Sequence, residues 1–169
     1  MEQRDTGILL NAHDIKLHRQ YFNEMVKLLG VQVLYRPVKE GSKTYNGYGE
    51  LDAFYDAPLL VGCIFEEHPN PKTMRKLGWN SELEENLSII HLPYDLERLQ
   101  RGNIVIVPSP IDHTQGRVFR IEEMSSIMVY PSAITCKIGP IFESTIQGDE
   151  RDYSSSNFNL LAVDEGDED

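Results

Sequence analysis

Side chains that could carry out acid–base or metal chemistry are spread along the chain without a recognisable pattern. The sequence has five histidines, at His13, His18, His68, His91 and His113. His13 and His18 are five residues apart, so they do not share one face of a helix. Cys63 and His68 lack the further nearby ligands that a structural zinc site requires. We therefore expect neither a metal site nor a cofactor.

The acidic residues offer no clear catalytic pair. They form adjacent couples: Glu66 with Glu67, Glu84 with Glu85, and Glu122 with Glu123. Neighbouring residues on a strand point to opposite faces, so such couples do not converge as the two carboxylates of a glycosidase do. Asp112 and His113 are neighbours in a loop, but no nucleophile accompanies them. Glycine-rich phosphate-binding loops and the GxSxG of serine hydrolases are also missing from the sequence, so we expect no enzyme activity.

Two cysteines, Cys63 and Cys136, each lie in an apolar segment of β type. Free cysteine behaves as a small hydrophobic residue, so we expect two buried thiols. A disulfide between them is an alternative, because the sequence does not give the separation of their Cα atoms.

The negative charge of the chain is concentrated near its C-terminal end. The 169 residues carry a net charge of −11, and residues 149–169 hold eight acids and one base. This segment contributes −7, which leaves only −4 for residues 1–148. Tight binding to nucleic acid needs clustered lysine and arginine, so the composition argues against it. No run of about 18 apolar residues occurs, and we expect no membrane-spanning helix.

Hydrophobic spacing predicts a mostly β (α+β) protein. Six strands are expected within residues 31–38, 58–67, 79–93, 103–108, 117–121 and 132–139. Helices are expected at 11–29 and 70–78, and one or two helical turns at 94–102. Several short strands at near-regular spacing are typical of a small antiparallel β-barrel or sandwich. The predicted fold is such a barrel or sandwich with an N-terminal helix, extended loops and a C-terminal arm.

Alternation predicts which side chains enter the core. Phe119 and Ile121 share one face of their strand, and Arg120 points the other way. On the last strand, the inward residues are Ile134, Cys136 and Ile138, and the outward ones are Thr135 and Lys137. The apolar stripe of the first helix consists of Ile15, Phe22, Met25, Val26 and Leu29. We expect this stripe to pack on the core.

The chain divides into three parts. An N-terminal segment and helix occupy residues 1–30, the β-barrel domain occupies 31–148, and an acidic arm occupies 149–169. A long excursion at 39–57, expected to contain a hairpin, interrupts the barrel domain. Its aromatic residues are Tyr45, Tyr48, Phe54 and Tyr55. Long loops in compact domains are usually functional or disordered, and four aromatics favour contact with a partner.

One stretch carries a resemblance to a known family. It reads PYDLERLQRGNIVIVPSPIDHTQGRVFRIEEM, residues 93–124, and contains a short turn, a glycine before a strand, a loop and a returning strand. This pattern resembles the core of neck proteins of tailed bacteriophages, the head-closure or head–tail connector class. The likeness is clearest over residues 83–139, about a third of the chain.

The resemblance implies a structural virion protein without enzyme activity. Identical subunits would form a ring in the neck, between the portal or adaptor protein and the tail proteins. The ring would close or connect the DNA channel, complete the head and join it to the tail, and it would be assembled in the host cytoplasm. Packaged DNA would pass without sequence-specific binding. Another connector, such as an adaptor or tail terminator, is an alternative within this class; a monomeric β-barrel that binds a ligand is an alternative outside it.

Candidate partner-contact residues follow from this reading. In the loop between residues 108 and 116 they are Asp112, His113 and Gln115. In the excursion they are Tyr45 and Tyr48. In the acidic arm they are Phe158, Leu160 and Leu161, whose apolar side chains could anchor the arm on a neighbour. No membrane partner is expected.

Overall fold

The computed structural model describes residues 12–45, 47–48, 51–79, 87–109, 111, 116–125 and 132–141. Its two helices are α1 (Ala12–Leu29) and α2 (Pro71–Lys76). Its strands are β1 (Val31–Arg36), β2 (Thr44–Tyr45), β3 (Leu51–Asp52), β4 (Leu59–Glu67), β5 (Ser88–Pro93), β6 (Ile104–Pro108), β7 (Gly116–Met124) and β8 (Ala133–Pro140). Neither helix combines the length and the hydrophobicity needed to cross a membrane.

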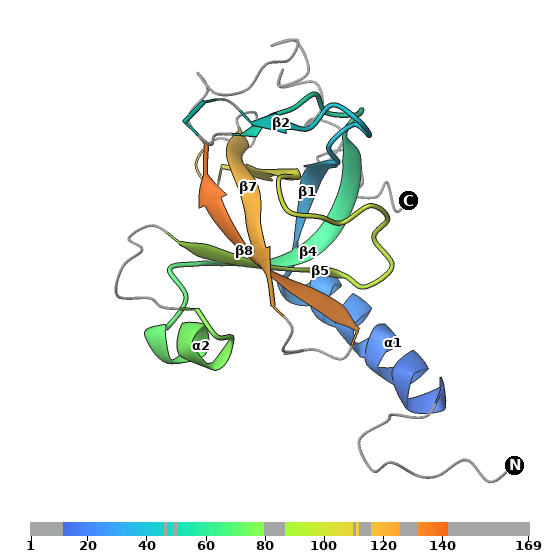
Figure 1. The fold of residues 1–169 in the computed structure, drawn as a ribbon. Helices are drawn as coiled ribbons and strands as arrows, with labels where there is room; N and C mark the ends of the chain where they lie inside the picture. The colour runs from blue at the N-terminus through green and yellow to red at the C-terminus, as the bar shows by residue number, and fades with distance from the viewer. Residues whose placement is uncertain are drawn as a thin grey trace, which may run out of the picture.

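Six of the strands close into a barrel in the order β1-β4-β5-β8-β7-β6, and every neighbouring pair is antiparallel (Figure 1). The prediction of a mostly β protein with a small antiparallel barrel and an N-terminal helix is confirmed. β2 and β3 form a separate hairpin within the predicted excursion. Because the barrel is closed, its six strands present no open edge to a neighbouring chain.

The barrel interior is filled by alternate residues of all six strands. The buried residues are Val33, Tyr35, Val61, Cys63, Ile90, Leu92, Val105, Val107, Phe119, Ile121, Cys136 and Ile138. The inward faces predicted for β7 and β8 are therefore confirmed, and Ile134 packs against the same cluster. The rings of Phe65 and Phe119 lie 5.6 Å apart and add an aromatic contact. Both cysteines are free and buried, as expected.

α1 packs along the outer face of β4. Phe22 is buried with Ile64 and Ala133, and Met25 and Val26 pack against them. Gly62 makes this approach possible, because a Cβ there would lie 2.9 Å from Cγ1 of Val26.

Of the predicted stripe, Phe22 is buried, Ile15, Met25 and Val26 are half-buried, and Leu29 is 72 % exposed. The stripe stops short because the helix ends at Leu29 and the chain turns into β1 at Gly30. The amide of Gly30 donates to the carbonyl of Val26 at 2.8 Å.

α2 covers another part of the outer surface. Asn70 caps the helix by accepting a hydrogen bond from the amide of Lys72 at 2.9 Å, and Pro71 occupies the first turn. Gly78 follows the helix with φ of +85°, a conformation that glycine adopts at little cost. The buried side chains of this region are Met74, Leu77, Trp79 and Ile89. Because α2 covers Ile89, β5 is buried on both faces.

The segment at 94–102 differs from the prediction of helical turns. The chain there passes through successive turns between β5 and β6 and forms no helix. Arg98 and Gly102 have positive φ values of 58° and 98°, which are incompatible with a continued right-handed helix. The carbonyl of Arg98 instead accepts hydrogen bonds from the side chains of Tyr35 and Asn103. These long-range contacts override the local helical propensity.

Candidate interaction surface

Two of the predicted contact residues fall within the described structure. Tyr45 is 64 % exposed and Tyr48 is 94 % exposed, and both belong to the β2–β3 hairpin region. Phe54, after the hairpin, is 60 % exposed. The other predicted residues lie outside the described residues: Asp112, His113, Gln115, Phe158, Leu160 and Leu161. In the loop that holds the first three, Ile111 is described and is 95 % exposed.

The excursion and this loop leave the barrel from opposite ends of β6. Arg36, the last residue of β1, pairs with Ile104 at the start of β6. Pro108, at the end of β6, pairs with Gly116 at the start of β7. The two predicted contact elements therefore begin at opposite ends of one short strand.

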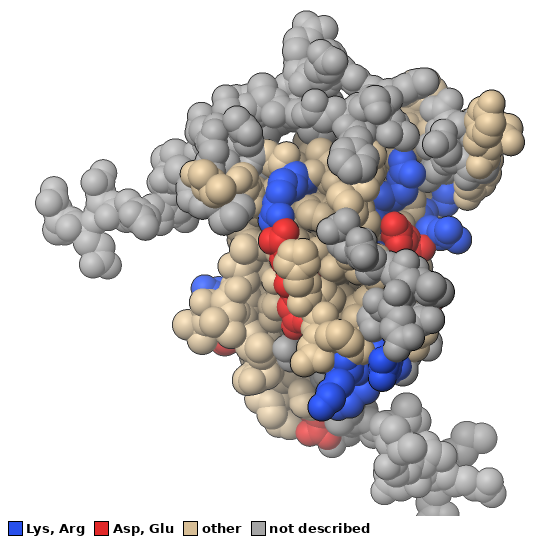
Figure 2. All heavy atoms as spheres, turned by 90° about the vertical axis from the view of Figure 1, so that its left-hand side faces the viewer, with Lys and Arg blue, Asp and Glu red and all other residues tan. Residues whose placement is uncertain are grey.

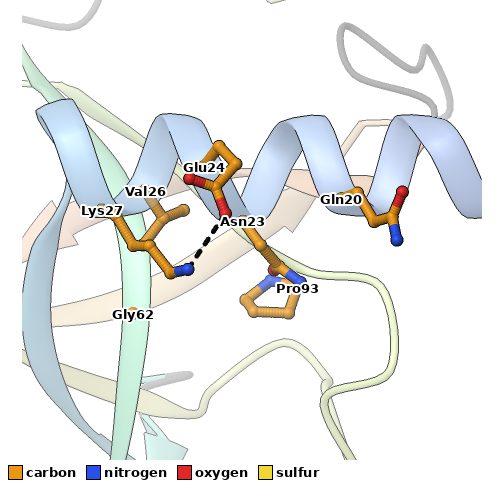
Figure 3. A pocket seen from close by; sticks show the side chains of 7 residues that line it. All are labelled: Gln20, Asn23, Glu24, Val26, Lys27, Gly62 and Pro93. Atoms are coloured by element: carbon orange, nitrogen blue, oxygen red, sulfur yellow. Dashed lines mark hydrogen bonds and ion pairs between the residues drawn. The ribbon is translucent and has the colours of Figure 1, made fainter.

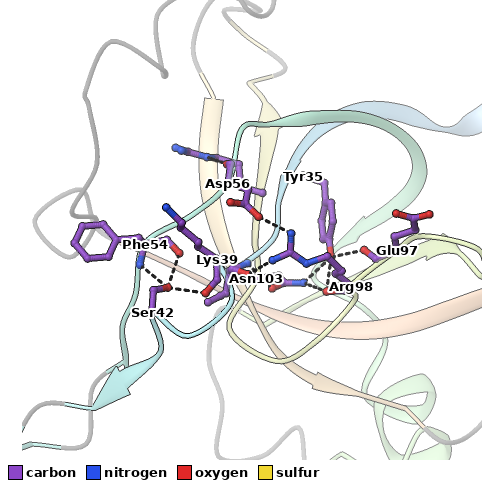
Figure 4. A network of polar contacts seen from close by, with 10 residues as sticks. Tyr35, Lys39, Ser42, Phe54, Asp56, Glu97, Arg98 and Asn103 are labelled. Atoms are coloured by element: carbon purple, nitrogen blue, oxygen red, sulfur yellow. Dashed lines mark hydrogen bonds and ion pairs between the residues drawn. The ribbon is translucent and has the colours of Figure 1, made fainter.

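A buried asparagine ties the base of the excursion to the barrel (Figure 4). Asn103 is fully buried, and its Oδ1 accepts a hydrogen bond from the amide of Val38 at 3.0 Å. Its Nδ2 donates to the hydroxyl of Tyr35 at 2.5 Å and to the carbonyl of Arg98 at 2.8 Å. Burial raises the pKa of Tyr35 to about 12, against the opposing effect of its hydrogen bond with Asn103. Sequence reasoning missed this network, although Asn103 stands at the glycine-to-strand junction of the recognised pattern.

Arg98 adds a second set of contacts at the same place. One guanidinium nitrogen lies 2.5 Å from Oδ2 of Asp56, and another donates to the carbonyl of Val38 at 2.7 Å. The hydroxyl of Ser42 donates to the carbonyl of Lys39 at 2.7 Å and accepts from the amide of Phe54 at 3.2 Å. Both ends of the excursion are thereby fixed, while the aromatic side chains of its hairpin remain exposed.

α1 carries a second apolar stripe that faces away from the barrel. Leu17 is 56 % exposed, Tyr21 is 60 % exposed and Leu28 is 80 % exposed. Their spacing of four and then seven residues places all three on one helix face. The sequence analysis identified only the inward stripe, although Leu17, Tyr21 and Leu28 also have helical spacing in the sequence.

A shallow groove of about 400 Å³ runs between α1 and the barrel (Figure 3). It is lined by Gln20, Asn23, Glu24, Val26, Lys27, Gly62 and Pro93. Glu24 and Lys27 pair with each other at 3.0 Å. The charged groups of the groove therefore neutralise one another.

The outer face of β5 and β8 holds buried polar side chains. Nδ1 of His91 lies 2.9 Å from Oγ1 of Thr135, and its Nε2 lies 3.8 Å from Glu66. Burial lowers the pKa of His91, and the carboxylate of Glu66 opposes this effect. Lys137 and Thr135 face outward as predicted, but both are buried. Within the described residues, no three histidine, cysteine or acidic side chains come together as a metal site.

Charges on the face formed by α2 and its neighbouring strands are mixed. Figure 2 shows lysine and arginine side chains in separate groups with acidic side chains between them. Ion pairs also join Arg117 to Glu67, and Nζ of Lys137 lies 3.6 Å from Glu122. The described part of this face offers no continuous basic surface for a phosphate backbone.

Comparisons with known proteins give little further guidance. No protein-family model matches the sequence. No curated protein matches it. The solution structure of protein SF1141 from Shigella flexneri 2a is similar, with a TM-score of 0.45 and 13 % sequence identity. The similarity covers 67 % of this chain and 93 % of that chain.

Proposed function

We propose that the chain is a structural subunit of the neck of a tailed bacteriophage. Identical copies form a ring between the portal or adaptor and the tail, and this ring closes or connects the DNA channel. The sequence resemblance over residues 93–124 supports the proposal, and it covers the end of β5, all of β6 and β7, and the turns between them.

The observation that carries the proposal is where the exposed apolar side chains lie. Large exposed ones occur on the outward face and at the C-terminal end of α1, in the excursion and at the start of β4: Leu17, Tyr21, Leu28, Leu29, Tyr45, Tyr48, Phe54, Leu59 and Leu60. Apolar surface that is left open on a folded subunit commonly marks a contact with another protein. Since the barrel strands have no open edge, subunits would meet through these side chains and not through strand addition.

The charge of the chain is compatible with a channel that DNA crosses. The net charge of −11 opposes tight binding to phosphate, so DNA would slide past the ring without being held. The role proposed for this ring is mechanical, and it requires no catalytic group.

The proposal is tested by the mass and shape of the purified full-length chain. Sedimentation velocity over a range of concentrations should show a species whose mass is a multiple of 19.3 kDa, and electron microscopy should show it as a ring. The variant Tyr45→Ser/Tyr48→Ser, which removes exposed apolar contacts, should shift the equilibrium toward monomer. Lys39→Ser is the control, because this exposed residue lies in the same excursion, has no apolar ring and enters the hydrogen bonds at its base through backbone atoms. A chain that stays monomeric at all concentrations would contradict the proposal.

A further inference from the structure

We propose that the outward face of α1 binds the C-terminal segment Phe158–Asp169 of a second copy of the chain. This inference rests on the proposed ring, because it names one contact between neighbouring subunits. Leu17, Tyr21 and Leu28 provide the apolar part of the receiving face. They protrude from a helix whose opposite face already packs on β4.

The first half of α1 provides a basic part. At pH 7 its charged residues are two bases, Lys16 and Arg19, against a single acid, Asp14. Lys16 is exposed, and the guanidinium of Arg19 lies 3.6 Å over the ring of Tyr94. The N-terminal end of a helix also bears a partial positive charge from its aligned peptide dipoles. An acidic ligand would therefore prefer this half of the helix.

The C-terminal segment has matching chemistry in a matching order. Its first half, FNLLAV, is apolar, and its second half, DEGDED, holds five acids. If the segment runs antiparallel to α1, its apolar half meets Tyr21 and Leu28, and its acidic half meets Lys16 and the start of the helix. An extended segment of this length spans roughly 40 Å, whereas α1 is about 27 Å long, so the whole helix is within reach.

The fold favours a neighbouring copy over the segment's own α1. β8 begins beside α1, where the hydroxyl of Ser132 donates to the carbonyl of His18 at 2.9 Å. The strand then runs away from α1 and the described chain stops at Ile141, beyond its far end (Figure 1). An extended strand from Ser132 to Ile141 covers roughly 30 Å. A random-coil chain of 16 residues, which is the length of segment 142–157, has a mean end-to-end distance of about 20–24 Å, less than this separation.

A contact between α1 of one copy and the arm of the next joins two different surfaces. Such heterologous contacts close into rings when the rotation between neighbours permits. The arm contact would therefore repeat around the proposed ring, in addition to the contacts made by the exposed side chains of the excursion.

Complementation between two full-length variants tests the inference. In Lys16→Glu/Leu17→Ser the receiving face is altered, and in Phe158→Ser/Leu160→Ser/Leu161→Ser the arm is altered. Each variant alone should sediment as a monomer, while an equal mixture should form dimers, because one intact arm meets one intact α1. Lys72→Glu, at an exposed position of α2, is the control and should assemble like the unaltered chain. Thermal unfolding of both variants should match that of the unaltered chain.

The other outcomes distinguish failure of this inference from failure of the proposed function. If rings form from both variants, the contact lies elsewhere and the proposed function still stands. If the arm variant unfolds at a clearly lower temperature, the arm packs on its own subunit. If the unaltered chain forms no ring, the proposed function fails, and a fluorescent peptide of sequence FNLLAVDEGDED then tests the α1 face directly. The peptide should bind the unaltered chain at least tenfold more tightly than Lys16→Glu/Leu17→Ser; equal affinity for both, or no binding, would overturn the inference.

Discussion

Asn103 accepts a hydrogen bond from the amide of Val38 at 3.0 Å, although the two residues are 65 positions apart in the chain. The same amide side chain donates to Tyr35 inside the barrel and to the carbonyl of Arg98 in the turn before β6. One buried residue thus joins the barrel, the turn and the first residues of the excursion. The position of the exposed aromatic hairpin depends on this junction.

Replacing Asn103 by alanine should destabilise the protein strongly. The change removes the acceptor of the hydrogen bond donated by the buried amide of Val38. It also removes the donor of a hydrogen bond that the hydroxyl of Tyr35 accepts. Each orphaned buried group costs about 1–3 kcal/mol, so the free energy of unfolding should fall by at least that amount in urea titrations. Asn23→Ala, at an exposed asparagine of α1, is the matched control and should change it little. Equal stability of the two variants would show that the hydrogen bonds of Asn103 do not contribute to the free energy of unfolding.

Replacing Phe119 by alanine should cost about 3–5 kcal/mol, because this core ring packs in the barrel interior and against Phe65. Tyr48→Ala removes an aromatic ring that is 94 % exposed and should cost much less. Arg120→Ala, on the opposite face of β7, should also cost less than Phe119→Ala. The comparison is made by chemical unfolding, and similar losses for Phe119 and Tyr48 would disprove the assigned inward face.

Stability should fall as the pH rises above about 9. Burial raises the pKa of Cys63 and of Cys136 from 9.0 to about 12, and that of Tyr35 from 10.0 to about 12. The unfolded chain releases these protons first, so each group lowers the free energy of unfolding by up to about 1.4 kcal/mol per pH unit within its window. Urea titrations between pH 8 and 11 measure the slope.

The variant Cys63→Ala/Cys136→Ala is the control for this alkaline loss. Its stability should depend less steeply on pH than that of the unaltered chain, because only Tyr35 of the three groups remains. Parallel curves for the two proteins would mean that the thiols are not protected in the folded state.

Protonation of His91 should lower the stability of the folded protein as the pH falls. Burial lowers its pKa, so the folded state resists a proton that the unfolded chain accepts below about 6.5. The stability advantage of the unaltered chain over His91→Gln should therefore shrink as the pH falls from 8 to 5. A constant difference between His91→Gln and the unaltered chain would contradict the assignment.

Local signals in the sequence predicted most elements of the barrel. Alternation in β7 and β8 identified the inward side chains, and Asn70, Pro71 and Gly78 marked the limits of α2. These features depend on neighbouring residues, which the sequence displays directly. The turns at 94–102 were mispredicted because their conformation depends on Tyr35 and Asn103, and such distant partners leave no local pattern.

The interaction surface was predictable only in part. The exposed tyrosines of the hairpin were recognisable because aromatics are unusual in a polar loop. The outward stripe of α1 has helical spacing, as the inward stripe does, but periodicity alone cannot tell which of two faces meets the barrel. The packing of Val26 over Gly62 decides that question and leaves Leu17, Tyr21 and Leu28 outside.

The most direct test of the ring proposal is the native mass of the full-length chain beside that of Leu17→Glu/Tyr21→Glu. We expect the unaltered chain to give one closed oligomer with a fixed number of 19.3 kDa subunits. The variant, whose changes fall on exposed positions of α1, should be a monomer that unfolds at the same temperature. A monomeric unaltered chain, or an oligomer that is unchanged in the variant, would contradict assembly through this surface.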